Sequence, residues 1–244
     1  MRRRELKNME WGLLVVAIIL SIIGIVALFS ATQETEYDEF KKQIIWFAVS
    51  LIVMVIVMLT NYETLVKLSP IFYGIFLILL VAVLFTKPVN GATSWFDIGG
   101  FSFQPSEFAK VAVILFLAFI ISKIQERYVE DINKPSRLLI IFVAVAIPLL
   151  LIIKQPDYGT AMAFCIALAM ILFAAGIDKK YIIGAIIIAG ISIPILYNFI
   201  LPEHAKKRID IFLNPESDPR GSGYNIIQSK LAIGAGQLTG MGLL

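Results

Sequence analysis

The fold of this chain is decided by uncharged stretches, of which WGLLVVAIILSIIGIVALFSATQ, Trp11 to Gln33, is the longest. A helix of about 20 apolar residues crosses the hydrocarbon core of a membrane, which is roughly 30 Å thick. Five further uncharged runs are also predicted to span: Gln43 to Tyr62, Leu68 to Thr86, Leu138 to Ile153, Tyr158 to Ile177 and Tyr181 to Pro202. A seventh span is predicted over Ser106 to Ser122, with Glu107 and Lys110 in its first turns.

The composition agrees with a membrane protein. Hydrophobic residues make up 59% of the chain and charged residues 16%, whereas a soluble domain has about half and about a quarter. Lipid cannot satisfy exposed backbone groups, and the runs are too long for barrel strands. We therefore predict an all-α, polytopic helical bundle: one transmembrane domain over residues 1–244, with seven transmembrane helices plus a stub. The stub is the uncharged run Leu231 to Leu244, which is too short to span, so the chain is expected to stop within or before an eighth helix.

The N-terminus has the basic start of a signal peptide, but its apolar run is too long and no small-residue cleavage site follows. We expect a retained first helix. The lone Cys165 lies inside an apolar run, which favours packing in the core over a disulfide or a metal cluster. His204 has no second histidine or cysteine nearby and is interpreted as a solvated loop residue. The net charge of +3 gives no indication of a nucleic-acid partner.

The distribution of basic residues predicts the orientation. With a cytoplasmic N-terminus, the inner segments before residue 201 hold eleven basic residues and the outer segments four, and an excess on the inside is the rule. Three polar loops then face outward, at residues 87–105, 154–159 and 201–230. The last of these is a large extracytoplasmic loop with basic residues against the usual bias, which suggests an anionic ligand. Its basic residues are Lys206, Lys207, Arg208, Arg220 and Lys230.

Two outer segments open helices with a proline and an acidic residue. In the first, Gln104 to Lys110, the residues Glu107 and Lys110 share one helix face. They form either a cap with a structural ion pair or an ionisable pair that marks a site. In the second, Asp157 follows Pro156 and would cap the next helix by default, with a role in orienting the neighbouring loops as the alternative. Trp95 is typical of a membrane-interface anchor.

Asp218 stands in the sequence NPESDPRGSGY, residues 214–224. Taken alone, Asp-Pro followed by Gly-x-Gly indicates a turn with a solvated carboxylate. The surrounding cations favour a catalytic role for Asp218. A carboxylate suits proton abstraction from a hydroxyl, and cations suit an anionic leaving group such as pyrophosphate.

The strings GATSWFDIGGFSFQPSEFAK, KQPDYGTA and FLNPESDPRGSGYNIIQSKLAIGAGQLTGMGL occur in that order. They resemble the signature segments of the SEDS family (shape, elongation, division and sporulation), whose members include RodA and FtsW. The last string is more similar to RodA members than to FtsW members. The resemblance covers essentially the whole chain.

The resemblance implies a peptidoglycan glycosyltransferase. Members polymerise lipid II, the undecaprenyl-linked disaccharide-pentapeptide, into glycan strands on the outer face of the bacterial cytoplasmic membrane. They act with a class B penicillin-binding protein and with other proteins of the cell-elongation complex. The essential aspartate of the family maps onto Asp218. Residues expected to bind substrate or support the site are Trp95, Gln104, Glu107, Lys110, Asp157, Asn214, Arg220, Gly221, Gly223, Tyr224, Gln228 and Ser229.

Two departures from the family pattern stand out. Many members have an arginine immediately before the loop tryptophan, whereas this chain has Ser94, which puts a phosphate-binding role for that position in doubt. Members also have about ten membrane helices, so the chain is expected to be a fragment that is inactive alone.

The implied reaction is a single inverting displacement with Asp218 as general base, a role worth roughly 10²–10⁴-fold in rate. A divalent cation, Mg²⁺ or Mn²⁺, could share the stabilisation of the pyrophosphate, although no metal-ligand motif is visible. Two other classes of function stay open: a lipid II flippase or transporter, and a scaffold that only recruits a transpeptidase. Transport predicts charges near the midplane of several helices, whereas the helices here are nearly free of charge.

Overall fold

The computed structural model describes residues 10–32, 38–88, 92–98, 101–126, 132–201, 203–237, 240 and 242. The chain divides into two compact units. Residues 45–182 belong to the first, and residues 10–44 with 183–244 form the second. Expectations for the N-terminal basic segment concern residues outside the described ranges.

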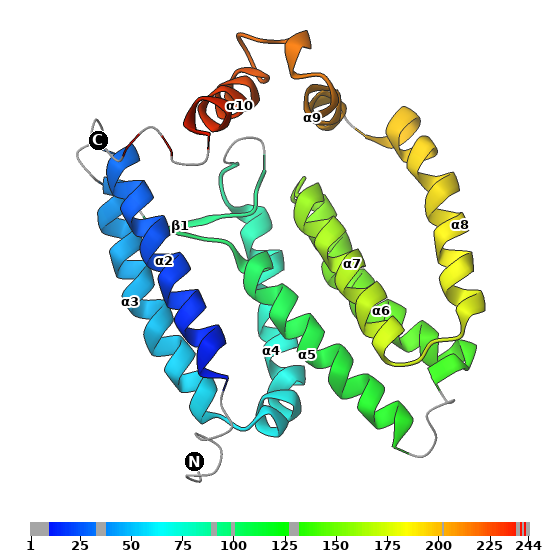
Figure 1. Ribbon diagram of the computed structural model, residues 1–244. Coiled ribbons are helices and arrows are strands. Elements are labelled where there is room, and N and C mark those ends of the chain that lie inside the picture. The colour runs from blue at the N-terminus through cyan, green and yellow to red at the C-terminus, as the bar shows by residue number, and fades with distance from the viewer. Residues whose placement is uncertain are drawn as a thin grey trace. The chain divides into compact units, whose positions relative to one another are not determined.

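The first unit is built from apolar helices that follow one another along the chain. They are most of α3 (Asp38–Leu59), α4 (Tyr62–Ala82), which continues into the 3₁₀ turn η2 (Val83–Phe85), α5 (Pro105–Gln125), α6 (Pro135–Lys154) and α7 (Tyr158–Ala174). Figure 1 shows α4, α5, α6 and α7 side by side, and α4 makes its most extensive contact with α5. Proline stands at the first position of α5 and α6, where its missing donor costs nothing.

The core of this unit lies between α4, α5, α6 and α7. Small residues at Ala109, Ala112, Ala144 and Ala161 are buried, which lets helix backbones approach closely. The Tyr73 hydroxyl donates to the Ala144 carbonyl oxygen at 2.8 Å, so a polar group inside the bundle is satisfied across two helices. Larger residues that complete the core are Leu80, Val113, Leu117, Ile121, Leu138, Ile141, Val145, Ile152, Phe164 and Leu172.

A short hairpin precedes α5 and departs from the predicted all-helical chain. Strand β1 (Phe96–Ile98) pairs antiparallel with β2 (Phe101–Phe103), and Phe96 lies opposite Phe103. The Phe103 ring lies 5.0 Å from that of Phe108 in α5, which ties the hairpin to the helix. The double glycine at positions 99 and 100 between two aromatic-rich triplets is a hairpin signal.

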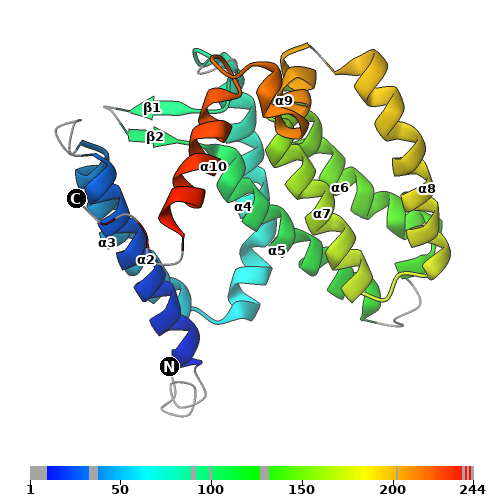
Figure 2. The ribbon, with the colours of Figure 1, turned by 45° about the horizontal axis from the view of Figure 1, so that its top comes forward.

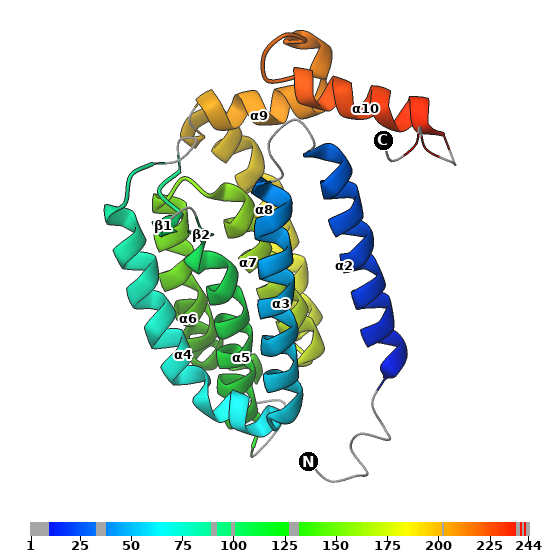
Figure 3. The same ribbon diagram turned by 90° about the vertical axis from the view of Figure 1, so that its left-hand side faces the viewer.

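The second unit contains α2 (Trp11–Ala31), the start of α3, most of α8 (Lys179–Ile195), the π-helical turn η4 (Leu196–Ile200), α9 (Glu203–Leu213), the 3₁₀ turn η5 (Pro215–Ser217) and α10 (Tyr224–Gly236). The rings of Phe29 and Phe40 meet edge to face at 5.2 Å where α2 and α3 adjoin. Figures 2 and 3 show α9 and α10 on either side of the connection that contains η5.

Two predictions are refined here and one is corrected. The predicted outer segment 201–230 is mostly helical, because α9 and the start of α10 lie inside it. The uncharged run from Leu231 begins inside α10, which starts at Tyr224 and ends at Gly236. Cys165 was predicted to pack in the core but is exposed on α7. The run that contains it is apolar on every side, so its sequence does not mark an inward face. The His204 backbone lies in α9, and the solvation predicted for it concerns a side chain outside those described.

A helix lies at each of the seven predicted spans. Within the described residues, five segments are long and apolar enough to cross a membrane. Helix α7 is apolar but has 17 residues, and α5 contains Glu107, Lys110 and Lys123. The number of seven transmembrane helices therefore stays a prediction. The five segments are Trp11–Ala31, Asp38–Leu59, Tyr62–Phe85, Pro135–Lys154 and Lys179–Phe199.

Candidate functional site

The Asp218 turn, residues 214–223, is a tightly hydrogen-bonded connection between α9 and α10. The Asp218 carbonyl oxygen accepts from the backbone N–H groups of Gly221 and Gly223, at 3.3 and 3.0 Å. The Ser217 hydroxyl donates to the Asn214 carbonyl oxygen at 2.8 Å. Backbone bonds of this kind fix the direction in which the Asp218 side chain leaves the turn.

The Asp218 carboxylate is held by one cation and one amide. Its Oδ2 atom lies 3.0 Å from Nζ of Lys207 in α9 and accepts from the Ser222 N–H at 3.2 Å. The hydrogen bond from Lys207, followed by that from the Ser222 amide, lowers the pKa of Asp218 below its ordinary value of 3.8. The lowered pKa keeps the carboxylate ionised at neutral pH, and the 34% of the side chain that is exposed leaves it open to a ligand.

Two glycines make this arrangement possible. A Cβ atom on Gly221 would lie 2.5 Å from Oδ1 of Asp218. A Cβ atom on Gly223 would lie 2.8 Å from the Asp218 carbonyl oxygen and closer still to that of Pro215. The two glycines of the Gly-Ser-Gly sequence therefore allow the close approach of the backbone to Asp218.

Two pockets adjoin the turn. One, of about 300 Å³, has two cations and a serine in its wall and is lined by Lys207, Arg208, Ile211, Ser222 and Ile226. The other, of about 510 Å³, is lined by Leu213, Asn214, Pro215, Glu216, Ile227, Lys230 and Leu231. The first contains both groups that bind the Asp218 carboxylate, and its cations suit an anionic ligand.

Other residues predicted for this loop lie near the turn without touching the Asp218 carboxylate. Arg220 is exposed in the turn. The ammonium group of Lys206 donates to the Asn198 carbonyl oxygen at 3.1 Å and so faces away from Asp218. Tyr224, Gln228 and Ser229 are exposed on α10.

A second polar cluster lies in the first unit. The Gln104 side-chain amide donates to Oδ2 of Asp157 at 2.8 Å, and Asp157 Oδ1 accepts from the Thr160 N–H at 3.1 Å. The predicted N-cap is confirmed. The bond to Gln104 also links the segment before α5 to the start of α7, which was the alternative role for Asp157.

Two further members of this cluster were not predicted for the site: Gln155, and Ser94, which was noted only as a departure from the family pattern. Both are fully buried. The Gln155 side-chain amide donates to the Leu80 carbonyl oxygen at 3.1 Å, and the Ser94 hydroxyl donates to the Gln155 carbonyl oxygen at 3.4 Å. The side-chain oxygens of Gln155 and Ser106 are buried without a hydrogen-bond partner among the described residues. Gln155 follows Lys154 at the end of a long apolar run, and a second polar residue there was the available signal.

Glu107 and Lys110 form the predicted ion pair, with Oε1 and Nζ 2.9 Å apart. The pair lies in the first turns of α5, and 50% of the Glu107 side chain is exposed. Trp95 is half-buried before β1. These residues belong to the first unit and Asp218 to the second, so whether they support the Asp218 site stays a prediction.

A metal-binding group of three or more His, Cys, Asp or Glu side chains does not occur among the described residues.

Comparison with known proteins places the whole chain in one group. The FtsW/RodA/SpoVE family profile, described as cell cycle protein, matches residues 10–244. Peptidoglycan glycosyltransferase MrdB of Escherichia coli is 35% identical over 240 residues, which cover 97% of this chain and 63% of MrdB. The probable peptidoglycan glycosyltransferase FtsW of Trichlorobacter lovleyi is 36% identical, over 98% of this chain and 64% of that protein.

Two solved structures are also similar to this chain. A chain of a peptidoglycan synthase complex, studied for how it coordinates polymerization and crosslinking, matches with a TM-score of 0.68 and 27% identity over 93% of this chain and 65% of its own. The rod shape determining protein RodA of Thermus thermophilus matches with a TM-score of 0.64 and 23% identity, over 75% of this chain and 59% of RodA. At that identity the likeness to RodA shows the fold alone.

The apolar helices and the polar connections between them define a multi-pass membrane protein with its polar chemistry in the connections. The chain belongs to the FtsW/RodA/SpoVE family. It spans somewhat less than two thirds of the length of the relatives reported above.

Proposed function

We propose that the protein containing this chain polymerises lipid II into glycan strands of peptidoglycan. Family membership and the names of the relatives support this class of reaction. One observation of this chain carries the assignment to a site: an ionised, partly exposed carboxylate, Asp218, is held in a glycine-dependent turn beside a pocket lined by Lys207 and Arg208.

The proposed step is an inverting displacement. The 4-hydroxyl oxygen of an acceptor GlcNAc bonds to the anomeric carbon of a donor MurNAc, while the bond from that carbon to the pyrophosphate oxygen breaks. Asp218 takes the hydroxyl proton, and undecaprenyl pyrophosphate leaves with the bonding electrons. The donor linkage is α and the new linkage is β, so one displacement suffices.

Lys207 links the binding of the pyrophosphate to proton abstraction by Asp218. While Lys207 holds the carboxylate at 3.0 Å, the low pKa of Asp218 makes it a weak base. A pyrophosphate entering the adjacent pocket competes for the ammonium group, which raises the pKa of Asp218 as the acceptor arrives. Arg208, at the edge of the same pocket, adds positive charge there.

The remaining predicted residues have supporting roles in this proposal. Arg220 and Lys206 add positive charge near the turn, Glu107 and Lys110 brace the start of α5, and apolar grooves between helices hold the lipid tails. A divalent cation would enter with the pyrophosphate, since Mg²⁺ is commonly bound through one or two carboxylates together with substrate phosphates.

The proposed location is the cytoplasmic membrane, with the N-terminus inside and the Asp218 turn outside. The excess of basic residues in the inner segments supports this orientation. The proposed partner is a class B penicillin-binding protein that crosslinks the strands. The match to a chain of a synthase complex, described as coordinating polymerization with crosslinking, supports this partner.

The test is Asp218→Asn in the gene product that contains this chain, purified and reconstituted with lipid II in liposomes. Glycan polymerisation is expected to fall by roughly 10²–10⁴-fold, with unchanged thermal stability and partner binding. Glu216→Gln, at an exposed acidic residue of the same turn, is the matched control and should stay within about twofold. Polymerisation that survives Asp218→Asn would remove Asp218 from the role of base. Lipid II translocation without polymerisation would favour the flippase instead.

A further inference from the structure

Helix α9, Glu203–Leu213, presents two different faces. Lys207 binds the Asp218 carboxylate, and Ile211, which is buried, lines the pocket between α9 and α10. With 3.6 residues per turn, the side chains of Ile209, Phe212 and Leu213 fall on the opposite face. Helix α9 therefore holds the turn with one face. On the opposite face Ala205, in the first turn, is buried, whereas the apolar residues of the C-terminal half are exposed.

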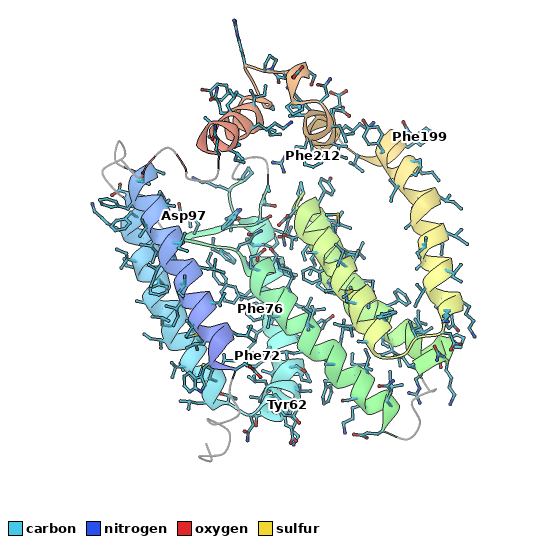
Figure 4. The ribbon with its side chains drawn as sticks, in the orientation of Figure 1. Tyr62, Phe72, Phe76, Asp97, Phe199 and Phe212 are labelled. Atoms are coloured by element: carbon cyan, nitrogen blue, oxygen red, sulfur yellow. The ribbon has the colours of Figure 1, made fainter. Side chains whose placement is uncertain are left out.

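That apolar face is exposed. The exposed fraction is 40% for Ile209 and 75% for both Phe212 and Leu213. Phe199, at the end of the preceding candidate span, is 83% exposed, and Figure 4 labels it together with Phe212. Single exposed apolar residues are ordinary on a protein surface, but a continuous apolar face marks an interaction site.

Cations border this face on both sides. Projected along the helix axis, Arg208 falls next to Phe212 at one edge, and Lys206 falls next to Leu213 at the other. An apolar stripe flanked by Lys or Arg is the pattern of helices that lie in a membrane surface, with the apolar side at the boundary of headgroups and acyl chains.

The connection between the candidate span and α9 is short, so α9 lies close to the membrane. The candidate span ends at Phe199 and α9 begins at Glu203, so the connection reaches at most about 14 Å even when fully extended. Two contacts hold it closer: the Tyr197 hydroxyl donates to Asp210 at 2.6 Å, and Lys206 donates to the Asn198 carbonyl oxygen. Helix α9 is thus fastened to the end of a transmembrane segment.

We propose that α9 is an interfacial helix. Ile209, Phe212 and Leu213 enter the lipid headgroup boundary on the Asp218 side of the membrane, and Arg208 and Lys206 bind the phosphates of anionic phospholipids. Through the ion pair between Lys207 and Asp218, this seating sets the height of the Asp218 turn above the hydrocarbon core. If the proposed function holds, it places the carboxylate at the level where a membrane-bound pyrophosphate substrate carries its reacting group.

Depth measurements test this directly. In a Cys165→Ala background, a single cysteine is introduced by Phe212→Cys, by Leu213→Cys or, as the control, by Glu216→Cys, and is labelled with a fluorophore in reconstituted liposomes. Lipids with a quencher near the top of the acyl chain should quench the labels at 212 and 213 at least threefold more than the label at 216. Iodide in the water should show the reverse order.

Either of two results would overturn the proposal. Equal quenching by iodide at 212 and 216 would mean that the face is in water. Protection of position 212 from both quenchers would mean that protein covers it. The measurement needs no catalytic activity, so its failure leaves the proposed function standing.

A second arm tests the phosphate contacts. Replacing phosphatidylcholine with a mixture containing phosphatidylglycerol should increase lipid quenching at position 212. Arg208→Gln should remove at least half of that increase, while Arg220→Gln, at an exposed arginine in the turn, should leave it unchanged. Quenching that does not depend on lipid charge would overturn the role given to anionic phospholipids.

Discussion

Asp157 and Asp218 look alike in the sequence, since each stands beside a proline and shortly before a glycine and a helix. Their surroundings differ. Asp157 gives one oxygen to the Thr160 N–H and the other to the Gln104 amide, and both donors are neutral groups of the fold. The Oδ2 atom of Asp218 receives the ammonium group of Lys207 and the Ser222 N–H.

The difference separates a structural aspartate from a chemical one. Neutral donors fixed in a helix start and a buried segment hold Asp157 whether or not a ligand is present. The cation on Asp218 is on a flexible side chain that is 58% exposed, so an incoming anion can displace it. Proline and glycine near an aspartate therefore indicate a turn, and the kind of donor that meets the carboxylate indicates its use.

Among changes that keep both aspartates, the largest effect is expected from one methyl group added in the Asp218 turn. Gly221→Ala places a Cβ atom 2.5 Å from the Asp218 carboxylate, which must then move. A displacement of about 1 Å in a reacting group can cost about 10²-fold in rate, so polymerisation of lipid II should fall by about that factor.

Gly159→Ala is the matched control, because a Cβ atom there has nothing within 4 Å. It lies two residues after Asp157 in the first turn of α7, where alanine favours the helix by about 0.5–1 kcal/mol. Activity should stay within about twofold and thermal stability should not fall. Equal losses of activity in the two variants would mean that the turns at Asp157 and Asp218 tolerate an added methyl group equally well. The distinction between the two aspartates would then not hold.

The next effect concerns charge. Lys207→Gln removes the first cause of the low pKa of Asp218, so that pKa rises toward its ordinary value. The acid limb of the pH profile of kcat/KM should move to higher pH, and the rate at neutral pH should fall by about 10- to 100-fold through loss of a charged donor to pyrophosphate. Lys206→Gln is the control, because Lys206 donates to the Asn198 carbonyl oxygen, and it should leave the acid limb in place.

The ion pair between Lys207 and Asp218 also affects how the stability of the folded state depends on pH. A carboxylate whose pKa is lower in the folded state stabilises that state above its unfolded pKa of about 3.9, and this stabilisation is lost as the pH falls through the folded value. Lys207→Gln should therefore reduce the acid-induced loss of thermal stability below about pH 4. An unchanged acid response would show that the pair does not persist in solution.

How much the sequence predicts depends on the kind of signal. The helices at the predicted spans were predictable, because uncharged runs have one stable form in lipid, and so was the capping by Asp157. The exposure of Cys165 was not, since α7 is apolar all round. Helix α9 was not either, because its charges resemble those of a loop unless the helical repeat is applied to them. The pairing of Asp218 with Lys207, eleven positions apart in the chain, depends on how the turn folds back.

A smaller effect is expected where Asp157 acts as a cap. Asp157→Ala leaves the Thr160 N–H without its capping partner, at about 1 kcal/mol, and removes the bond to Gln104, at about 1 kcal/mol more. The melting temperature in detergent should fall accordingly. Asp157→Asn should lose less than half as much, because asparagine caps about as well as aspartate. If the two variants lose stability equally, the carboxylate charge and not the cap holds this position.

The smallest effect is expected at Gln155, in the same cluster. Its side-chain amide donates to the Leu80 carbonyl oxygen at 3.1 Å, a bond worth about 1 kcal/mol. Its side-chain oxygen is buried with no hydrogen-bond partner among the described residues, which costs about 1–3 kcal/mol. Gln155→Met keeps the volume and removes both terms, so the free energy of unfolding should change by less than about 1 kcal/mol. A loss above about 2 kcal/mol would mean that the oxygen is satisfied by a bound water, and would give this buried cluster a larger share in holding α4 to the start of α7.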